Sequence, residues 1–182
     1  MASKRSLRKT VQIVARAVSL APLLAMVAPV PAAPLPGGAG SLVETYQDWV
    51  VACQGRDGQS FCVMRQVQSN NQTGQNVVTV EFSAAQGKLN GLLLLPFGLA
   101  LADGASVKID GDAKNRALPF STCLPQGCLA PVSFEADDVT KLKGAAALNV
   151  AARSFSPPQP IDLKISLKGF STALNRITEL TR

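Results

Sequence analysis

The sequence has no histidine and few aromatic residues, and both shortages limit the chemistry available to it. Its 182 residues include one Trp, one Tyr, seven Phe and no His. Without imidazole, a chain lacks the usual general base at neutral pH and the partner that activates Ser and Cys nucleophiles. No glycine-rich phosphate loop follows an expected strand. We therefore predict that the protein is not an enzyme and that it binds no cofactor.

Two pairs of carboxylates are the remaining candidates for catalysis. Asp110 and Asp112 flank a glycine in a turn pattern, and Asp137 and Asp138 begin a segment that can form two helical turns. Structural roles explain both pairs, because acidic residues favour turns and the amino ends of helices. A hydrolase that uses two of these four carboxylates is the alternative, and it requires a pocket that separates their pKa values.

The amino terminus has the pattern of a secretory signal peptide. A basic segment precedes an apolar run over residues 17–30, and small residues follow that run. The run has 14 residues, fewer than the roughly 20 that a membrane-spanning helix needs. We predict a signal peptide over residues 1–32, cleaved after Ala32, with no transmembrane anchor after cleavage.

The positive charge of the chain belongs largely to this export segment. The whole sequence has 18 basic and 12 acidic residues, a net charge of +6. Five of the basic residues lie in the signal, so 13 basic residues remain against 12 acidic ones. These five residues are Lys4, Arg5, Arg8, Lys9 and Arg16. A nucleic-acid-binding domain keeps a basic patch after folding, so nucleic acid is not an expected partner.

The mature chain is predicted to be one domain of mainly β structure. Residues 33–45 begin with a segment rich in Pro, Gly and Ala and are expected to form a flexible lead-in to a domain at 46–182. Short apolar stretches broken by turn residues predict an antiparallel sandwich or barrel. The clearest strand is 161–167, where every second residue from Ile161 is apolar. Further strands are expected at 49–53, 61–67, 78–82, 106–109, 128–134 and 146–151.

Two further patterns complete the expected fold. Residues 92–95 are all leucine and end at Pro96, which predicts a strand buried on both faces or the interior of a barrel. A barrel lined by this run would suit a carrier of an apolar ligand, a further alternative for function. Apolar residues recur at helical spacing from Phe170 to Leu180, which predicts a short carboxyl-terminal helix.

Four cysteines form two closely spaced pairs, Cys53 with Cys62 and Cys123 with Cys128. An even number of cysteines in an exported chain most often forms disulfides, because the compartment is oxidising. Four cysteines allow three connectivities. We choose the two local pairs because each brackets a turn. The spacings match neither a zinc knuckle nor a C-x-x-C redox motif, so structural bridges are predicted and a metal is not.

Several short motifs occur in a defined order along residues 46–180. A Trp precedes the first Cys, and Gln66 follows the second. An L-P-x-G-x-x-L-x-x-G stretch then begins at Leu95, and a Phe-x-x-Cys followed by Gly-Cys spans 120–128. The last motif, S-L-x-G-F-x-x-A-L, spans 166–174. In this order the chain resembles the invasion-associated locus B family of exported bacterial envelope proteins.

The resemblance implies a periplasmic or surface-associated role, linked to host-cell entry in pathogenic members, and it brings no active-site residues. The leading hypothesis is an exported, disulfide-stabilised binding protein of the bacterial envelope that contributes to host-cell interaction or invasion. It is expected in the periplasm, with attachment to the outer surface or secretion as alternatives. Its partner is expected to be an envelope or host-surface protein or glycan.

We predict that the exported protein begins at residue 33 and carries both disulfides. The intact mass of its four-cysteine chain is then four hydrogens below that of the reduced chain. Mass spectrometry of the periplasmic fraction under non-reducing conditions measures the mature terminus and the bridges together. Alkylation of the native, unreduced protein by iodoacetamide would contradict the two bridges.

Overall fold

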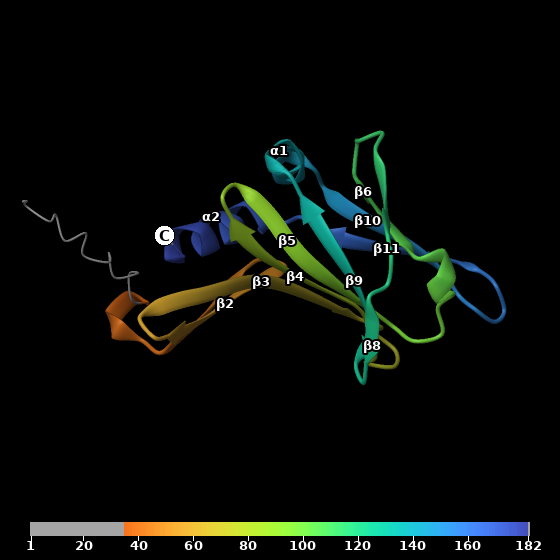
Figure 1. Ribbon diagram of the computed structural model, residues 1–182, viewed down its shortest axis with the longest axis horizontal. Coiled ribbons are helices and arrows are strands. Elements are labelled where there is room, and N and C mark those ends of the chain that lie inside the picture. The colour runs from red at the N-terminus through yellow and green to blue at the C-terminus, as the bar shows by residue number, and fades with distance from the viewer. Residues whose placement is uncertain (1–34, 182) are drawn as a thin grey trace, which may run out of the picture. The chain divides into compact units, whose positions relative to one another are not determined.

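The computed structural model describes residues 35–181, most of which lie in β-strands (Figure 1). The expected signal segment, 1–32, lies outside the described residues. The strands are β1 (Ser41–Tyr46), β2 (Trp49–Arg56), β3 (Gln59–Ser69), β4 (Asn76–Ala85), β5 (Lys88–Leu95), β6 (Ala105–Ile109), β7 (Asn115–Leu118), β8 (Thr122–Leu124), β9 (Gly127–Phe134), β10 (Ala147–Arg153) and β11 (Pro160–Ser166). The helices are α1 (Ala136–Gly144) and α2 (Phe170–Leu180), with short 3-10 turns η1 (Pro36–Gly38) and η2 (Leu101–Asp103).

The strands form two antiparallel sheets. The larger has seven strands in the order β1-β2-β3-β4-β5-β9-β8, and the smaller has four in the order β11-β10-β6-β7. The predicted mainly-β class is confirmed. Over residues 35–181 neither sheet closes on itself, so of the two expected arrangements, sandwich or barrel, the structure has the sandwich.

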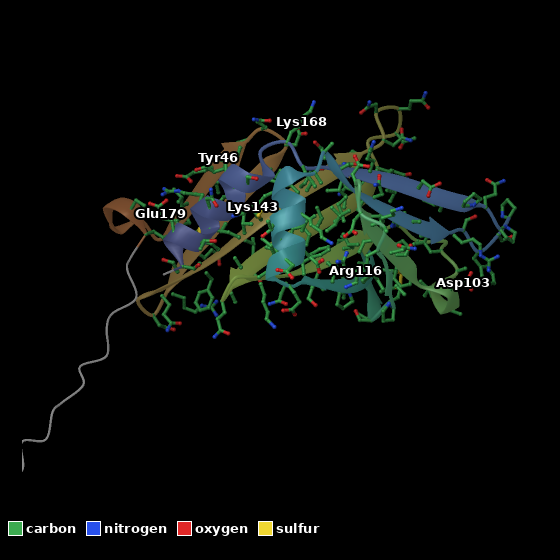
Figure 2. All side chains as sticks on the ribbon, turned by 90° about the horizontal axis from the view of Figure 1, so that it is seen from above. Tyr46, Asp103, Arg116, Lys143, Lys168 and Glu179 are labelled. Atoms are coloured by element: carbon green, nitrogen blue, oxygen red, sulfur yellow. A yellow bond between two sulfur atoms is a disulfide. The ribbon has the colours of Figure 1, made fainter. Side chains whose placement is uncertain are left out.

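One face of the seven-stranded sheet carries the core. Figure 2 shows both helices and the four-stranded sheet on the same side of the larger sheet. Helix α2 packs on β1–β4, and α1 packs on β5 and β9. Trp49 is fully buried there, with its ring centroid 5.8 Å from that of Phe82 and 5.4 Å from that of Phe170. Trp49 is therefore a core residue, because three packed aromatic rings bury a large apolar area.

The two sheets are joined by the side chain of Gln66 in β3. Its Nε2 donates to the carbonyl oxygen of Ser166 at 2.9 Å, and its Oε1 accepts from the backbone N–H of Ser166 at 3.2 Å. Trp49 Nε1 donates to the same carbonyl at 3.0 Å. Gln68 Nε2 donates to the carbonyl of Lys164 at 2.8 Å. One edge of β11 pairs with β10, and no described strand pairs with its other edge. The side-chain amides of Gln66 and Gln68 provide hydrogen-bond partners for backbone groups on that unpaired edge.

Helix α2 begins where only glycine fits. Gly169 has a φ of 82°, and a Cβ atom there would lie 2.0 Å from the carbonyl oxygen of Tyr46. This close approach brings the helix start against β1. The apolar face expected for this helix is confirmed, because its members are all buried. They are Phe170, Ala173, Leu174, Ile177 and Leu180.

Two expectations about the strands need correction. Strand β1 begins at Ser41, before the expected domain start at residue 46, because residues 41–46 pair with β2 along their full length. The leucines at 92–95 are not buried on both faces. Leu93 and Leu95 lie in the core, but Leu92 is 41% exposed, because no described element covers the outer face of the seven-stranded sheet. Strands β7 and β8 were not anticipated.

We expect Gln66→Leu to lower the free energy of unfolding by about 1–3 kcal/mol, because it leaves the buried N–H of Ser166 without an acceptor. Urea unfolding followed by circular dichroism measures this loss. Gln68→Leu is the matched control and should lose less, because its bond to β11 is exposed. Equal losses at the two positions would show that burial of the amide is not the cause.

Candidate functional site

The four predicted cysteines lie in two hairpins. A disulfide joins Cys53 to Cys62, which are directly opposite each other in β2 and β3. A second joins Cys123 to Cys128, opposite each other in β8 and β9. The structure therefore has the local pairing. On the loop-entropy model, each short bridge contributes roughly 2–3 kcal/mol to stability.

The four candidate carboxylates do not form an acid–base pair. Asp112 forms an ion pair with Lys141, with Oδ2 and Nζ 2.9 Å apart, and Asp138 forms one with Arg116. Asp110 and Asp137 are exposed. No hydrogen bond or ion pair joins any two of the four to each other in the described range.

The charge state of Asp112 also disfavours acid catalysis. It shares a shallow hollow of about 310 Å³ with Asp110 and Lys141. The hydrogen bond from Lys141 lowers the pKa of the Asp112 carboxyl, and backbone N–H groups act in the same direction. A general acid needs a raised pKa. The predicted turn and helix-start roles explain these residues better.

Residues 35–181 also have neither a metal-binding cluster nor a membrane-spanning helix. They contain no group of three His, Cys, Asp or Glu side chains placed to hold a metal ion. Nor do they contain a helix with the length and apolar character needed to cross a bilayer. What the described chain offers instead are surfaces, and two of them are the outer faces of the sheets.

The outer face of the four-stranded sheet carries a polar groove. It is a shallow hollow of about 540 Å³ over β6, β7, β10 and β11. A row of four polar residues crosses all four strands: Lys164 lies opposite Asn149, Asn149 opposite Lys108, and Lys108 opposite Asn115. Neither lysine ammonium group has an ion pair or hydrogen bond within the described chain. Both are therefore available to a ligand.

Small residues hollow out the neighbouring row. Ala151 lies opposite Ser106 on one side and Asp162 on the other. The side chains of Ser106 and Ala151 are shorter than those around them, so the surface of the sheet is lower at these two positions. Asp162 adds a hydrogen-bond acceptor at the β11 side. The groove can therefore donate from ammonium and amide groups and accept from amide and carboxylate oxygens.

The strongest charged cluster lies away from the groove and has a structural role. Arg176 of α2 contacts both carboxylate oxygens of Glu44 in β1, at 2.7 and 2.9 Å, and also contacts Glu179 at 3.1 Å. Tyr46 donates its hydroxyl to Glu44 at 2.8 Å. Figure 2 shows Tyr46 beside α2, with Glu179 on that helix. These bonds fasten the carboxyl-terminal half of α2 to the edge strand of the sheet.

The pKa values in this cluster reflect the same bonds. The hydrogen bond from Arg176 lowers the pKa of the Glu44 carboxyl below its usual value. Burial raises the pKa of Tyr46, and its hydrogen bond to Glu44 adds to the effect. The hydrogen bond to Glu44 also raises the pKa of Arg176. The pKa shifts of Glu44 and Arg176 favour the ionised pair at neutral pH, and the shift of Tyr46 keeps its hydroxyl protonated as a donor to Glu44.

Comparisons with known proteins agree on one family. The family model described as Invasion associated locus B (IalB) protein matches residues 49–178. An Invasion protein B homolog of Brucella abortus (strain 2308) is 59% identical over 152 residues, 83% of this chain and 87% of that protein. Invasion protein B of Bartonella bacilliformis is 32% identical over 155 residues, 82% of each chain.

A solved structure supports the same relation. The crystal structure of invasion associated protein B from Bartonella henselae matches with a TM-score of 0.71 and 31% identity. The match covers 76% of this chain and 96% of that chain. The motifs that carry the resemblance hold the fold together: Trp49 and Gln66 bond to β11, and Gly169 begins α2. They do not line the polar groove.

We expect Arg176→Met to lower stability at neutral pH, because the ion pair with Glu44 is lost. The folded pKa of Glu44 lies below the unfolded value of 4.5. The stabilisation is therefore present above that pH and disappears as the pH falls through the folded pKa. Thermal unfolding of wild type and variant should show a difference at neutral pH that narrows in acid.

The matched control for this pair is Lys88→Met. The ion pair of Lys88 with Glu135 is exposed, so its loss should change stability little at either pH. A difference between Arg176→Met and wild type that stays constant from neutral to acidic pH would contradict the assignment.

Proposed function

Because the chain belongs to the invasion associated locus B family, we propose that it is an exported envelope protein that acts by binding an acidic, hydroxyl-rich polymer. The polymer would be a glycan of the envelope or of a host surface. It would bind in the polar groove of the four-stranded sheet, without chemical change. The signal pattern at 1–32 and the two disulfides support export to the periplasm or beyond it.

The observation that carries the proposal is the row Lys164–Asn149–Lys108–Asn115. Strands lie about 4.8 Å apart, so the two lysines are attached to backbones roughly 10 Å apart, with an amide between them. Such a row suits a chain with repeated acidic groups, which the ammonium groups would contact, and hydroxyls, which the amides would bond. The low floor at Ser106 and Ala151 lets the polymer lie close to the sheet.

The charge distribution favours this ligand over nucleic acid. The chain without residues 1–32 carries 13 basic and 12 acidic residues, so no broad basic surface attracts a densely charged phosphate backbone. The groove instead offers two lysines and one carboxylate, Asp162, among neutral hydrogen-bonding groups. That composition suits a sparsely charged, heavily hydroxylated chain. The names of the relatives, which refer to invasion, support a host-surface glycan as one source of the ligand.

We expect Lys108→Ala/Lys164→Ala to weaken binding of a hyaluronan oligosaccharide, which has one carboxylate per disaccharide, about tenfold, as the loss of two exposed charge contacts implies. Isothermal titration with the mature, oxidised protein measures the affinity, which should fall as salt is added. Neutral dextran is the probe control and should bind more weakly.

The matched variant is Lys88→Ala/Lys143→Ala, which removes the same charge outside the groove. It should bind the oligosaccharide nearly as well as the wild type. If both double variants lost the same affinity for the oligosaccharide, the net charge of the protein, and not the position of the lysines, would account for binding. Absence of binding to any acidic polymer would overturn the proposal.

A further inference from the structure

The outer face of the seven-stranded sheet carries exposed apolar side chains and is uncovered in the described structure. Its exposed side chains include Val43 at 69%, Phe61 at 58%, Val67 at 46% and Leu92 at 41%. Partly buried apolar residues fill the positions between them: Val50, Ala52, Val63, Leu94 and Leu129. Polar residues share the face, chiefly the cross-strand row Ser83, Asn90 and Ser133. The exposed apolar side chains beside them still mark an interaction surface, because their contact with water is unfavourable.

The inner part of one row of this face has a symmetrical order. The strand register places six residues side by side across six strands: Thr45, Val50, Arg65, Glu81, Leu92 and Pro131. The two charged residues are at the centre, on β3 and β4. An apolar residue flanks each of them, on β2 and β5. The row therefore matches at β2 and β5 and has opposite charges at its centre, while its two end residues, Thr45 and Pro131, differ.

The two central charges have no partners in the described chain. Arg65 and Glu81 are cross-strand neighbours, yet no ion pair or hydrogen bond within residues 35–181 involves either side chain. Apolar side chains lie beside both charges, with Val50 next to Arg65 and Leu92 next to Glu81, and an unpaired charge is unfavourable there once water is excluded. A surface that covers this face must therefore supply an acid opposite Arg65 and a base opposite Glu81.

A second copy of the chain supplies both groups. We propose that two copies pack these outer faces together about a two-fold axis that runs along the strands between β3 and β4. The axis exchanges β3 with β4 and β2 with β5. Arg65 then meets the partner's Glu81, and Val50 meets the partner's Leu92. A two-fold interface is self-complementary in this way, so each contact occurs twice.

The size of the face is sufficient for such a contact. Six strands about 4.8 Å apart and three rows about 6.8 Å apart make a face of roughly 500 Å² on each chain. Two faces bury about 1,000 Å², the area at which specific interfaces begin. Burial of the exposed apolar side chains favours association of the two chains. The pairs between Arg65 and the partner's Glu81 set the register of one sheet on the other.

The contact would also place the polar grooves on opposite sides of the dimer. Each groove is on the outer face of the four-stranded sheet, away from the seven-stranded face. A dimer therefore presents two grooves to a repeating polymer, which raises its effective affinity. The dimer itself does not depend on the groove binding any ligand.

Charge reversal at the centre of the face tests the proposal. Sedimentation of the mature, oxidised protein should show a dimer for the wild type. R65E and E81R should each raise the dimer dissociation constant at least about 100-fold, because each variant puts like charges opposite each other. A 1:1 mixture of the two variants should form a heterodimer, since Glu and Arg then face each other at both central positions. The double variant R65E/E81R should also recover the dimer.

The controls separate association from folding. Thermal unfolding checks that each variant is folded, and recovery in the mixture excludes misfolding as the cause of dissociation. Lys108→Glu reverses a charge on the opposite face and should leave the dimer unchanged. A wild-type monomer at all concentrations would overturn the proposal. So would a dimer that R65E and E81R leave intact.

Discussion

The placement of the four-stranded sheet depends on the side-chain amide of Gln66. This amide bonds to both the N–H and the carbonyl of Ser166, as a neighbouring strand would. A one-residue slip of β11 would leave these buried groups unpaired and would turn its apolar residues toward solvent. The interaction therefore sets the register of β11 against the larger sheet. Through the pairing of β11 with β10, it also sets the position of the polar groove.

The residues shared with the family serve this arrangement more than they serve any chemistry. Trp49 combines aromatic packing with a hydrogen bond to the same carbonyl of Ser166. Gly169 follows Ser166 by three residues. Because glycine has no Cβ, the backbone can pass close to the carbonyl oxygen of Tyr46 before α2 begins. The disulfides hold the two hairpins at the ends of the larger sheet. None of these residues lines the polar groove.

The outer faces of the two sheets differ in polarity. In the proposed assembly, the face of the four-stranded sheet contacts water and the face of the seven-stranded sheet contacts a second copy of the chain. The four-stranded sheet alternates apolar core residues with polar ones such as Lys108 and Asn149, which is typical of a face exposed to water. On the seven-stranded sheet the inner face is apolar, and the outer face combines exposed apolar side chains with charged and polar ones. Exposed apolar side chains on a second face are expected when a partner excludes water from them. The alternation rule therefore distinguishes a fully hydrated face from one that also carries apolar residues.

The strands with clear period-two patterns, the apolar face of α2 and the cysteine pairs that bracket turns could be predicted from the residue order, because these signals lie within short segments. The uncovered second face of residues 92–95 could not, since an apolar run looks the same whether or not its outer face is covered. Nor could the placement of Lys108 and Lys164 in one row, or of Arg65 opposite Glu81. These positions follow from strand register, which depends on hydrogen bonds between separate segments of the folded chain.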